Sequence, residues 1–354
     1  MCSACVRRQI PGVQTQSTTV AQVLPTHTPV LFDAAVARAA EWLRAGELVA
    51  LPTETVYGLA ANALDARAVA KIFQTKGRPP TNPVIVHVGG INMARRCVAH
   101  WPPTADRLAQ AFWPGPLTLV LPRSAEIPDI VTAGGPTVGV RWPRHTFIQA
   151  VIRACGFPLA APSANVSNQV SPTNIGHVLK GLGHRIALIV DGGQSQVGIE
   201  STVLDLTARP PRVLRPGMIH GESLRALVGD LGSSDGGRPA GGPLPSPGLL
   251  PRHYAPGATL RLLGWRDDSD LHRQLADLNL SPTGTHVIAH TRIPSPDNLA
   301  QVRVLPHDAE AFARALYAEL HRCDEEGAAC IVVETPPEAP EWGAIHDRLR
   351  RAAA

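Results

Sequence analysis

The sequence predicts an α/β protein in which a mixed, twisted sheet with flanking helices is followed by a smaller α/β domain. First, the chain has 354 residues, 44% of them hydrophobic, which is enough for two buried cores. Second, apolar runs of strand length mix with segments of helical period without strict alternation. Third, a segment rich in Gly, Pro and Ser, 229–256, separates these elements into two groups.

The first group of elements begins at Asp33, which we expect to cap a helix that ends at Gly46. A buried strand is expected directly afterwards, and Asp65 and Gly77 are expected to bound the next helix. The remaining apolar and periodic runs predict further strands and two more helices. The strands are expected at 48–51, 84–88, 117–121, 138–141, 159–160, 187–190, 201–206 and 213–214, and the helices at 104–112 and 145–155.

The second group lies beyond the Gly- and Pro-rich segment and is typical of a small α/β domain of about one hundred residues. Strands are expected at 260–263, 286–290 and 330–334, and helices at 271–278, 309–323 and 342–353. The first thirty residues contain no acid and no apolar h-region, which favours a disordered tail over a targeting signal. We therefore expect a disordered extension over 1–30, a catalytic domain over 31–222, a linker over 223–257 and a C-terminal α/β domain over 258–354.

Composition narrows the class of protein but identifies no partner. The net charge is +4, and the basic residues are scattered rather than gathered in a run that would coat a nucleic-acid backbone. No stretch approaches the ~18 continuous apolar residues of a membrane span. Only Cys2 and Cys5 have C-x-x-C spacing, and a zinc site would need further ligands nearby. We therefore expect reduced thiols, no metal ligands and a cytoplasmic protein.

The common nucleotide and hydrolase motifs are absent from the sequence. It has no G-x-x-x-x-G-K-[ST] P-loop and no G-x-G-x-x-G after the first strand. It also lacks a G-x-S-x-G nucleophile elbow and an H-E-x-x-H zinc motif. A nucleotide site in this chain must therefore be built in another way.

Polar residues gather between the strand at 48–51 and the strand at 84–88. Thr53, Glu54 and Thr55 follow the first of these strands in a loop, where functional groups are common. Lys76 and Arg78 flank the glycine that ends the next helix, and two cations so placed can bind phosphate oxygens. The alternative is a solvated helix C-terminus, where the helix dipole favours cations in any case. This segment alone leaves both interpretations open.

Several short motifs follow, each of them weak alone. Arg141 ends a strand and is either functional or an edge arginine, and Ser163 and Ser171 are equally typical of turns. Arg215 either binds a ligand or extends from a strand end into solvent. The motifs are TVGVR (137–141), APSAN (161–165), SPT (171–173), GIESTV (198–203), RPG (215–217) and SPGLLPRHYAP (246–256).

In this order the motifs resemble the YrdC-like threonylcarbamoyl-AMP synthase family in its long, two-domain form. The resemblance extends from about Leu31 to the C-terminus and is strongest from Leu51 to Gly217. It implies a YrdC-like mixed sheet with a smaller Rossmann-like C-terminal domain. It also implies that L-threonine, bicarbonate or CO2, and ATP are converted to threonylcarbamoyl-AMP and pyrophosphate, with Mg2+ entering on ATP.

The resemblance also implies roles for individual residues. Lys76, Arg78 and Arg141 would be catalytic, and Tyr254 implies that the linker folds over the bound nucleotide as a lid. The implied threonine site is Thr55, His87, Arg141 and Ser201. The implied ATP site is Lys76, Arg78, Asn82, Thr137, Ala161, Ser163, Ser171, Arg215 and Tyr254.

The same resemblance implies that the product passes to a separate threonylcarbamoyl transferase complex that modifies tRNA. Weak binding of RNA by this chain is left open, and no membrane partner is expected. Two alternatives from other classes are an RNA-binding module without catalysis and an enzyme that forms a carbamoyl adenylate. The first predicts RNA affinity without pyrophosphate release, and the second predicts release that does not depend on threonine.

Overall fold

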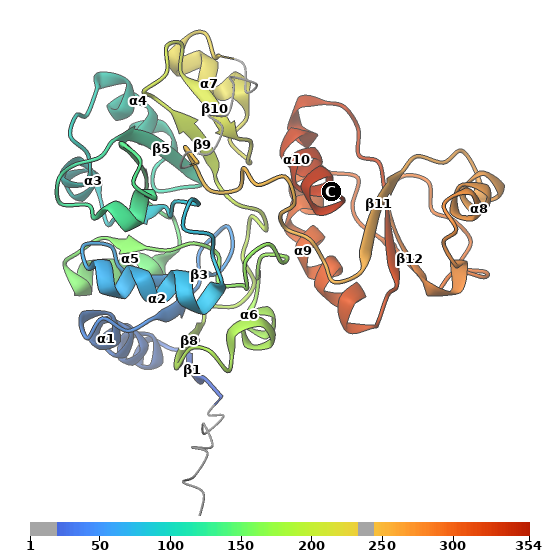
Figure 1. Cartoon of the computed structure of the whole chain (residues 1–354), viewed down its shortest axis with the longest axis horizontal. Helices are drawn as coiled ribbons and strands as arrows, with labels where there is room; N and C mark the ends of the chain where they lie inside the picture. Colours follow the sequence, from blue (N-terminus) through green and yellow to red (C-terminus); the bar gives the residue numbers. More distant parts are fainter. Residues whose placement is uncertain (1–19, 233–243) are drawn as a thin grey trace, which may run out of the picture.

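The computed structural model describes residues 20–232 and 244–354. Within this part of the chain, ten strands form a large mixed sheet and four strands form a smaller parallel sheet. Figure 1 shows the two domains side by side, with α9 (Ala309–Glu325) and α10 (Gly343–Ala352) facing the first domain and α8 (Asp268–Asp277) on the far side. This architecture confirms the predicted α/β fold class with its smaller second domain.

The large sheet mixes parallel and antiparallel neighbours. The pairs β1–β8, β2–β8, β4–β6 and β5–β9 are parallel, and the other neighbouring strands are antiparallel. In spatial order the strands are β1 (Gln22–Pro25), β8 (Leu188–Asp191), β2 (Val49–Leu51), β3 (Gly58–Asn62), β7 (Leu159–Ala160), β4 (Val86–His87), β6 (Thr137–Arg141), β5 (Leu117–Pro122), β9 (Thr202–Asp205) and β10 (Arg212–Arg215).

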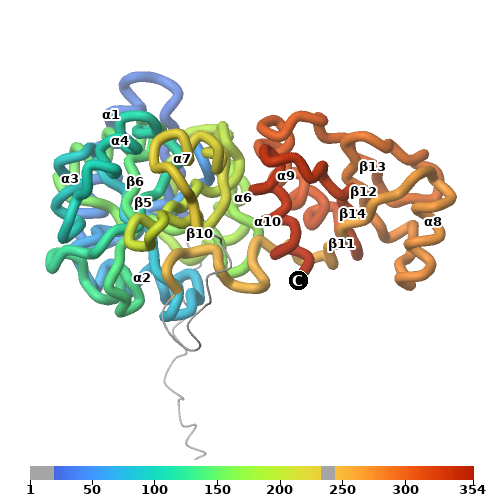
Figure 2. Tube along the Cα trace, turned by 90° about the horizontal axis from the view of Figure 1, so that it is seen from above, coloured from blue at the N-terminus to red at the C-terminus, as the bar shows by residue number. Residues whose placement is uncertain are grey.

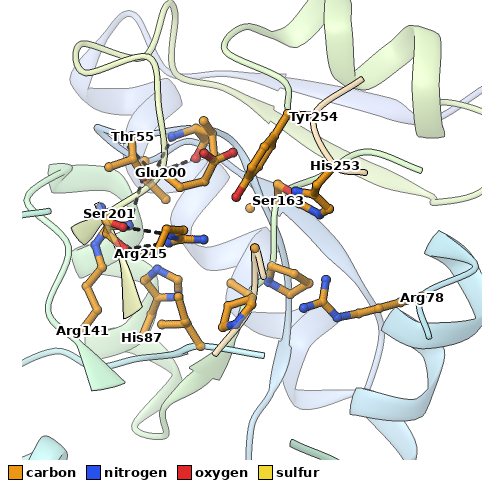
Figure 3. A pocket seen from close by; sticks show the side chains of 18 residues that line it. Thr55, Arg78, His87, Arg141, Ser163, Glu200, Ser201, Arg215, His253 and Tyr254 are labelled. Carbon is orange, nitrogen blue, oxygen red and sulfur yellow. Dashed lines mark hydrogen bonds between the residues drawn. The ribbon is translucent and has the colours of Figure 1, made fainter. Parts of the chain in front are cut away.

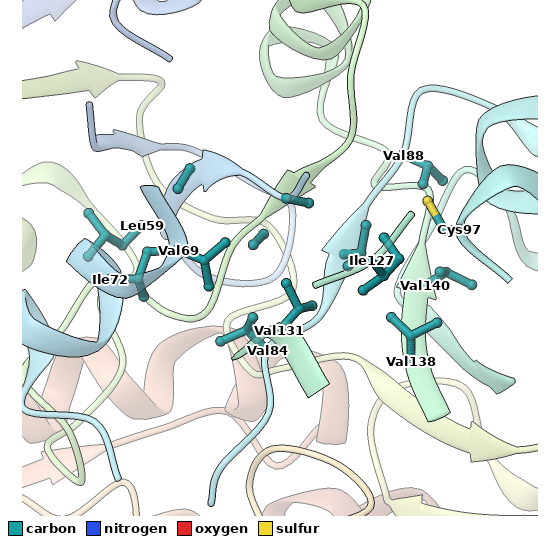
Figure 4. Packing of buried hydrophobic residues seen from close by; sticks show 14 of the residues in the cluster. Leu59, Val69, Ile72, Val84, Val88, Cys97, Ile127, Val131, Val138 and Val140 are labelled. Carbon is teal, nitrogen blue, oxygen red and sulfur yellow. The ribbon is translucent and has the colours of Figure 1, made fainter. Parts of the chain in front are cut away.

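Helices cover both faces of this sheet and bury separate apolar clusters. Helices α1 (Pro29–Arg44) and α5 (Thr146–Cys155) pack together over one cluster. Figure 4 shows part of the other cluster, in which Val69 and Ile72 of α2 (Ala66–Lys76) lie near Leu59 and Val84. Each fully buried side chain of this size contributes about 1.5–3 kcal/mol. The remaining elements of this domain are α3 (Ile91–Cys97), α4 (Pro103–Phe112), the 3-10 turn η1 (Asp129–Thr132), α6 (Ile175–Leu182) and α7 (Gly221–Val228).

The C-terminal domain contains a four-stranded parallel sheet. Its spatial order is β11 (Thr259–Leu263), β14 (Cys330–Glu334), β12 (Thr285–Ala289) and β13 (Gln301–Val304), with short 3-10 turns η2 (Pro282–Gly284) and η3 (Pro340–Trp342). Helix α8 buries Leu271 and Leu275 in one cluster with this sheet. Helices α9 and α10 contribute to a second cluster with the sheet. Helices therefore cover both faces of a parallel sheet, as expected for such sheets.

The second cluster of the C-terminal domain also contains residues of the first domain. Val56, Val170 and Ile199 of the first domain are buried with Phe312 and Ile345 of the second. Figure 2, seen from above, again places α9 and α10 between the first domain and the four-stranded sheet. A shared apolar core fixes the relative position of two domains far better than a polar contact does.

The structure corrects two predictions near the N-terminus. Helix α1 begins at Pro29 and is capped by Thr28, whose hydroxyl accepts from the backbone of Leu31 at 3.3 Å, so Asp33 is not the cap. Proline at the first helical position makes this earlier start favourable. Residues 22–25 of the predicted disordered extension form β1, paired with β8. Residues 1–19, with Cys2 and Cys5, lie outside the described part of the chain.

Two other differences concern a strand inside the first domain and the end of that domain. Strand β3 was not predicted, because its sequence, GLAAN, lacks the β-branched and aromatic residues that mark strands. Helix α7 packs against α4, so the packed elements of the first domain continue beyond residue 222.

Four cysteines, Cys97, Cys155, Cys323 and Cys330, are buried free thiols. Among the described residues, no helix combines the length and apolar character that crossing a membrane requires.

Candidate active site

A small cavity lies between the first domain and the segment Ser246–Pro256, which we call the lid. Figure 3 shows Arg141 and His87 at one side of the cavity and Arg78 at the other, with His253 and Tyr254 of the lid among them. The predicted site residues that line the cavity are Thr55, Arg78, His87, Arg141, Ala161, Ser163, Ser201, Arg215 and Tyr254. Lys76, Asn82, Thr137 and Ser171 are not among its lining residues.

A tight turn after β2 presents Thr55 to the cavity. The Thr53 hydroxyl donates to the carbonyl of Val56 at 2.6 Å and accepts from the backbone of Thr55 at 3.2 Å. Threonine hydroxyls favour such local turns over a continuing strand. Arg141, at the end of β6, donates from Nη1 to the Thr55 hydroxyl at 3.0 Å. The turn and the strand end are therefore joined directly.

Arg141 also forms a buried ion pair with Glu54, which was not predicted as a site residue. Nη2 lies 2.7 Å from Glu54 Oε1, and both side chains are 4% exposed. Burial alone would raise the pKa of Glu54, but Arg141 and the backbone N–H of Arg144 hold it below the ordinary value. Glu54 is therefore ionised at neutral pH and fixes the plane of the guanidinium.

His87 lies beside this pair and is neutral. Burial, and after it the positive charge of Arg141, lowers the pKa of His87 to about 3. Neither ring nitrogen has a hydrogen-bond partner among the described residues, although the side chain is buried. Buried polar atoms are nearly always paired, so two unpaired ring nitrogens at a cavity wall are available to bind water or a ligand. One nitrogen of a neutral imidazole donates and the other accepts.

Ser201 connects the strand β9 to the end of β10. Its hydroxyl lies 2.8 Å from the Thr118 hydroxyl and accepts from Arg215 Nη2 at 3.1 Å. Arg215 Nε donates to the Ser201 carbonyl at 3.0 Å. Gly217 allows this approach, because a Cβ there would lie 2.4 Å from the backbone nitrogen of Thr202. Thr118 is a further residue that sequence reasoning missed, since its strand resembles any core strand.

Arg78 and Arg215 are buried cations without a carboxylate partner. In the described part of the chain, neither forms an ion pair within 4.0 Å, and they are 8% and 4% exposed. Arg78 instead donates to the carbonyl and the side-chain oxygen of Asn82 at 2.9 and 2.8 Å. Burial lowers the pKa of Arg78 to about 9, so it remains charged at neutral pH. Asn82 therefore orients Arg78 rather than lining the cavity.

Lys76 supports the neighbouring loop instead of entering the cavity. Its ammonium donates to the Ser163 carbonyl at 2.6 Å, to the Asn165 side chain at 3.0 Å and to the Asn165 backbone. These three acceptors use the three donors of the ammonium. Burial and the charge of Arg78 lower the pKa of Lys76 well below its ordinary value. Lys76 thus fixes the 163–165 segment, which presents Ser163 to the cavity.

Glu200 joins the cavity to the C-terminal domain. Its side chain accepts from the Ser171 hydroxyl at 2.6 Å, from the Tyr317 hydroxyl at 3.1 Å and from Arg348 Nε at 2.7 Å. Ser171 is therefore held behind the cavity wall. Thr137 lines a neighbouring hollow that shares Ile85 and Pro247 with the cavity. This hollow extends the cavity beneath the lid.

The lid closes the cavity with two aromatic side chains. Tyr254 is 1% exposed, and its hydroxyl has no partner among the described residues. Burial raises the pKa of Tyr254 and lowers that of His253 to about 3, so both side chains are neutral. Gly248 is required here, because a Cβ would lie 2.5 Å from the Tyr254 hydroxyl and 2.8 Å from Arg215. The described structure is thus a closed form.

The fold and the cavity define a two-domain α/β protein with a lidded cavity, in which Arg78 and Arg215 have no carboxylate partner among the described residues. The comparisons with known proteins agree with this class. Residues 41–217 match the family model described as "Telomere recombination", and residues 219–354 match "Threonylcarbamoyl-AMP synthase, C-terminal domain". Two relatives named threonylcarbamoyl-AMP synthase come from Pyrococcus abyssi and Bacillus subtilis. They are 39% and 40% identical, and the matches cover 89% and 91% of this chain and 93% of each relative.

A solved structure is similar over nearly the whole chain. It is the crystal structure of P. abyssi Sua5 complexed with L-threonine, with a TM-score of 0.85 and 36% identity over 95% of this chain and 98% of that one. The chain belongs to the threonylcarbamoyl-AMP synthase family, as the sequence motifs predicted.

Proposed function

We propose that the cavity under the lid binds L-threonine on its Arg141 side and ATP on its Arg78 and Arg215 side. The chain belongs to a family of threonylcarbamoyl-AMP synthases, and we propose that it makes this product and pyrophosphate from L-threonine, bicarbonate or CO2, and ATP. The assignment of individual residues to the two substrates follows what the resemblance implies, and burial, charge and unpaired polar atoms support it.

The pair of buried arginines without counter-ions carries this assignment. A buried cation is costly unless an anion pairs with it, and Arg78 and Arg215 have no carboxylate partner in the described part of the chain. A triphosphate supplies the missing negative charge and accepts the paired N–H groups of a guanidinium fork. We assign the nucleoside part of ATP to the side of the cavity that adjoins the hollow beside Thr137, where the lid must move outward to make room for it.

The opposite end of the cavity suits a zwitterionic amino acid. Arg141 is oriented by Glu54 and Thr55, and its guanidinium is a suitable partner for a carboxylate. His87 and Ser201 supply neutral donors and acceptors for the hydroxyl and the amine of threonine. A neutral His87 does not compete with Arg141 for the carboxylate, and it can accept from the amine.

The chemical step follows from placing the two substrates side by side. The amine of threonine combines with CO2 to give an N-carboxylate, with loss of a proton. A carboxylate oxygen then attacks the α-phosphate of ATP, the bond to the β-phosphate breaks, and pyrophosphate leaves. Both reactants are anions, so positioning and cationic stabilisation by Arg78 and Arg215 are the main catalytic tasks. The step requires no covalent enzyme nucleophile.

Mg2+ is proposed to enter with ATP rather than on protein ligands. Glu200, which lines the cavity, and Glu54, which lies behind Thr55, are already held by Arg348 and Arg141. In the described ranges, no group of three or more His, Cys, Asp or Glu side chains forms a metal site. The phosphates and water would therefore supply the oxygen ligands that Mg2+ prefers.

The closed lid protects the product. Threonylcarbamoyl-AMP is a mixed anhydride, and Tyr254 and His253 cover the cavity where it would form. Substrate entry and product release then require the lid to move. We propose that the product passes in the cytoplasm to a separate threonylcarbamoyl transferase complex for tRNA modification. Direct RNA binding by this chain is not required for that transfer.

The decisive experiment is pyrophosphate release from ATP and bicarbonate by the purified chain, with and without L-threonine. We expect release that depends on threonine and is lost in Arg141→Ala. The exposed Arg96→Ala is the control and should behave as wild type. Arg141→Ala leaves the buried Glu54 without its ion-pair partner, which could itself destabilise the protein. The double variant Glu54→Gln with Arg141→Met is therefore measured as well, because it leaves no unpaired charge.

The alternative functions predict other results. Release that is indifferent to threonine would favour the carbamoyl-adenylate alternative. Absence of release from a folded protein that binds RNA would favour the RNA-binding module. Threonine-dependent release that survives in both Arg141 variants would leave the function standing and refute the proposed carboxylate clamp.

A further inference from the structure

We propose that Arg348, on the last helix of the C-terminal domain, is a positioning residue for adenylate formation. It neutralises Glu200 and holds the ring of Tyr254, so that Arg215 remains free for the phosphates and the lid stays closed over them. The proposal rests on the function proposed above and gives the C-terminal domain a part in the active site.

Arg348 contacts three separate segments of the site, although it lies outside the cavity. Nε donates to Glu200 Oε2 at 2.7 Å, and Nη2 donates to the Pro216 carbonyl at 3.0 Å. Its guanidinium carbon lies 5.0 Å from the centre of the Tyr254 ring. The side chain is 1% exposed, and a guanidinium stacked on a ring in such a desolvated place is strongly attracted to it. One arginine therefore joins GIESTV, RPG and the lid.

Glu200 would otherwise compete for the phosphate-binding arginine. It immediately precedes Ser201, to which Arg215 is hydrogen-bonded at 3.0 Å. Burial raises the pKa of Glu200, but Arg348 first and then Arg215 hold it below the ordinary value, so the carboxylate is charged. Without Arg348, the cation left to neutralise Glu200 is Arg215. A phosphate and Glu200 would then share one guanidinium.

Helix α10 also holds the lid through the side chain and the carbonyl of Arg351. Arg351 donates from Nη1 to the Leu250 carbonyl at 2.8 Å, and its own carbonyl accepts from the backbone of His253 at 3.1 Å. Asp347 fixes Arg351 at 2.9 Å. These contacts hold Tyr254 at a φ of 61°, a left-handed conformation that a residue with a Cβ adopts only when its surroundings impose it. The closed lid is therefore imposed by α10.

The close approach of the C-terminal domain is built into the same motif that carries Glu200. Gly198 has a φ of 85°, and a Cβ there would lie 2.4 Å from the Cα of Arg314 in α9. On the other side, its backbone N–H donates to the Thr55 carbonyl at 3.1 Å. The 198–201 segment thus touches the C-terminal domain with one side and the proposed threonine loop with the other.

The test compares Arg348→Met, Arg348→Lys, Glu200→Gln and the double variant Glu200→Gln with Arg348→Met. Arg350→Met is the control, since Arg350 is an exposed arginine on the same helix. For each full-length protein, kcat and the KM values for ATP and L-threonine are measured by threonine-dependent pyrophosphate release. Thermal unfolding reports the folded fraction separately.

We expect Arg348→Met to lower kcat/KM for ATP by about 10- to 100-fold, the range for a displaced positioning group. KM for L-threonine should stay within about twofold, because Arg348 forms no hydrogen bond to the residues proposed to bind threonine. The double variant should recover most of the ATP loss, since it removes the charge that diverts Arg215. Arg348→Lys keeps the positive charge and should lie between Arg348→Met and wild type.

Several results would overturn the proposal. Wild-type kinetics in Arg348→Met would show that Arg215 and the lid do not depend on Arg348. A fall in kcat that matches the folded fraction, with both KM values unchanged and no recovery in the double variant, would reduce Arg348 to a structural role. If Arg348→Met fails to fold, Arg348→Lys and the double variant decide the outcome by the same criteria. A wild-type protein without threonine-dependent release would instead refute the proposed function itself.

Discussion

Replacing Gly198 by alanine tests how the two domains are held together. The residue has a φ of 85°, and a left-handed alanine costs about 1–2 kcal/mol. The added methyl group would also lie 2.4 Å from the Cα and 2.8 Å from the carbonyl oxygen of Arg314. Such overpacking of a buried contact costs about 1–3 kcal/mol more. We therefore expect a total loss of about 2–5 kcal/mol in the free energy of unfolding.

Gly193→Ala is the matched control for this variant. Its φ is 76°, and a Cβ there meets no atom within 4 Å, so it bears the backbone cost alone. Urea unfolding of both variants and of wild type, followed by far-UV circular dichroism, gives the two losses. Equal losses in Gly198→Ala and Gly193→Ala would refute the close approach of α9 as the reason for the glycine.

Three further predictions address single polar groups of the site. Tyr254→Phe removes a hydroxyl that has no protein partner among the described residues. The free energy of unfolding should therefore change by less than about 1 kcal/mol, while KM for ATP rises about 2- to 10-fold. An unchanged KM would mean that the hydroxyl does not bind ATP. Lys76→Met should destabilise the fold by about 1–3 kcal/mol, because it leaves buried oxygen atoms of Ser163 and Asn165 without a hydrogen-bond donor. Wild-type stability with a raised KM for ATP would instead make Lys76 a phosphate ligand. Because the pKa of Glu54 in the folded protein lies below the ordinary value of 4.5, the ionised carboxylate stabilises the fold above pH 4.5, and this contribution is lost as the pH falls through the lower, folded-state pKa. The stability difference between wild type and Glu54→Gln should therefore shrink as the pH falls below 4.5, and a constant difference would contradict the ion pair.

The sequence predicted which segments form the site better than which atoms face the ligand. The family resemblance grouped Thr55, His87 and Arg141, and they line one cavity because each follows or ends a strand of the same sheet. The same reasoning could not distinguish Arg78, which lines the cavity, from its near neighbour Lys76, which supports the 163–165 loop. Side-chain direction at a helix end depends on the loop packed against it, and the sequence carries no local signal for that contact.

The contacts of the C-terminal domain with the cavity could not be predicted from the sequence for a similar reason. Arg348 stands in the run Arg348-Leu349-Arg350-Arg351, which has the composition of a solvated helix end. Only the docking of α10 buries Arg348 while leaving Arg350 exposed. Glu54 and Glu200 lie next to residues that were predicted to bind anions. A carboxylate in such a place requires a cation of its own, and this requirement could have pointed to both residues.

In our proposal, the distribution of charges around the cavity gives both domains a part in one site. Glu54 is neutralised by Arg141, and Glu200 is neutralised by Arg348 from the second domain. Because each carboxylate has its own arginine, Arg78 and Arg215 remain for an anionic ligand. A first domain alone would keep Glu200 without Arg348, and the phosphate end of the cavity would lose net positive charge. The C-terminal domain thus sets the electrostatics of the proposed ATP site as well as the position of the lid.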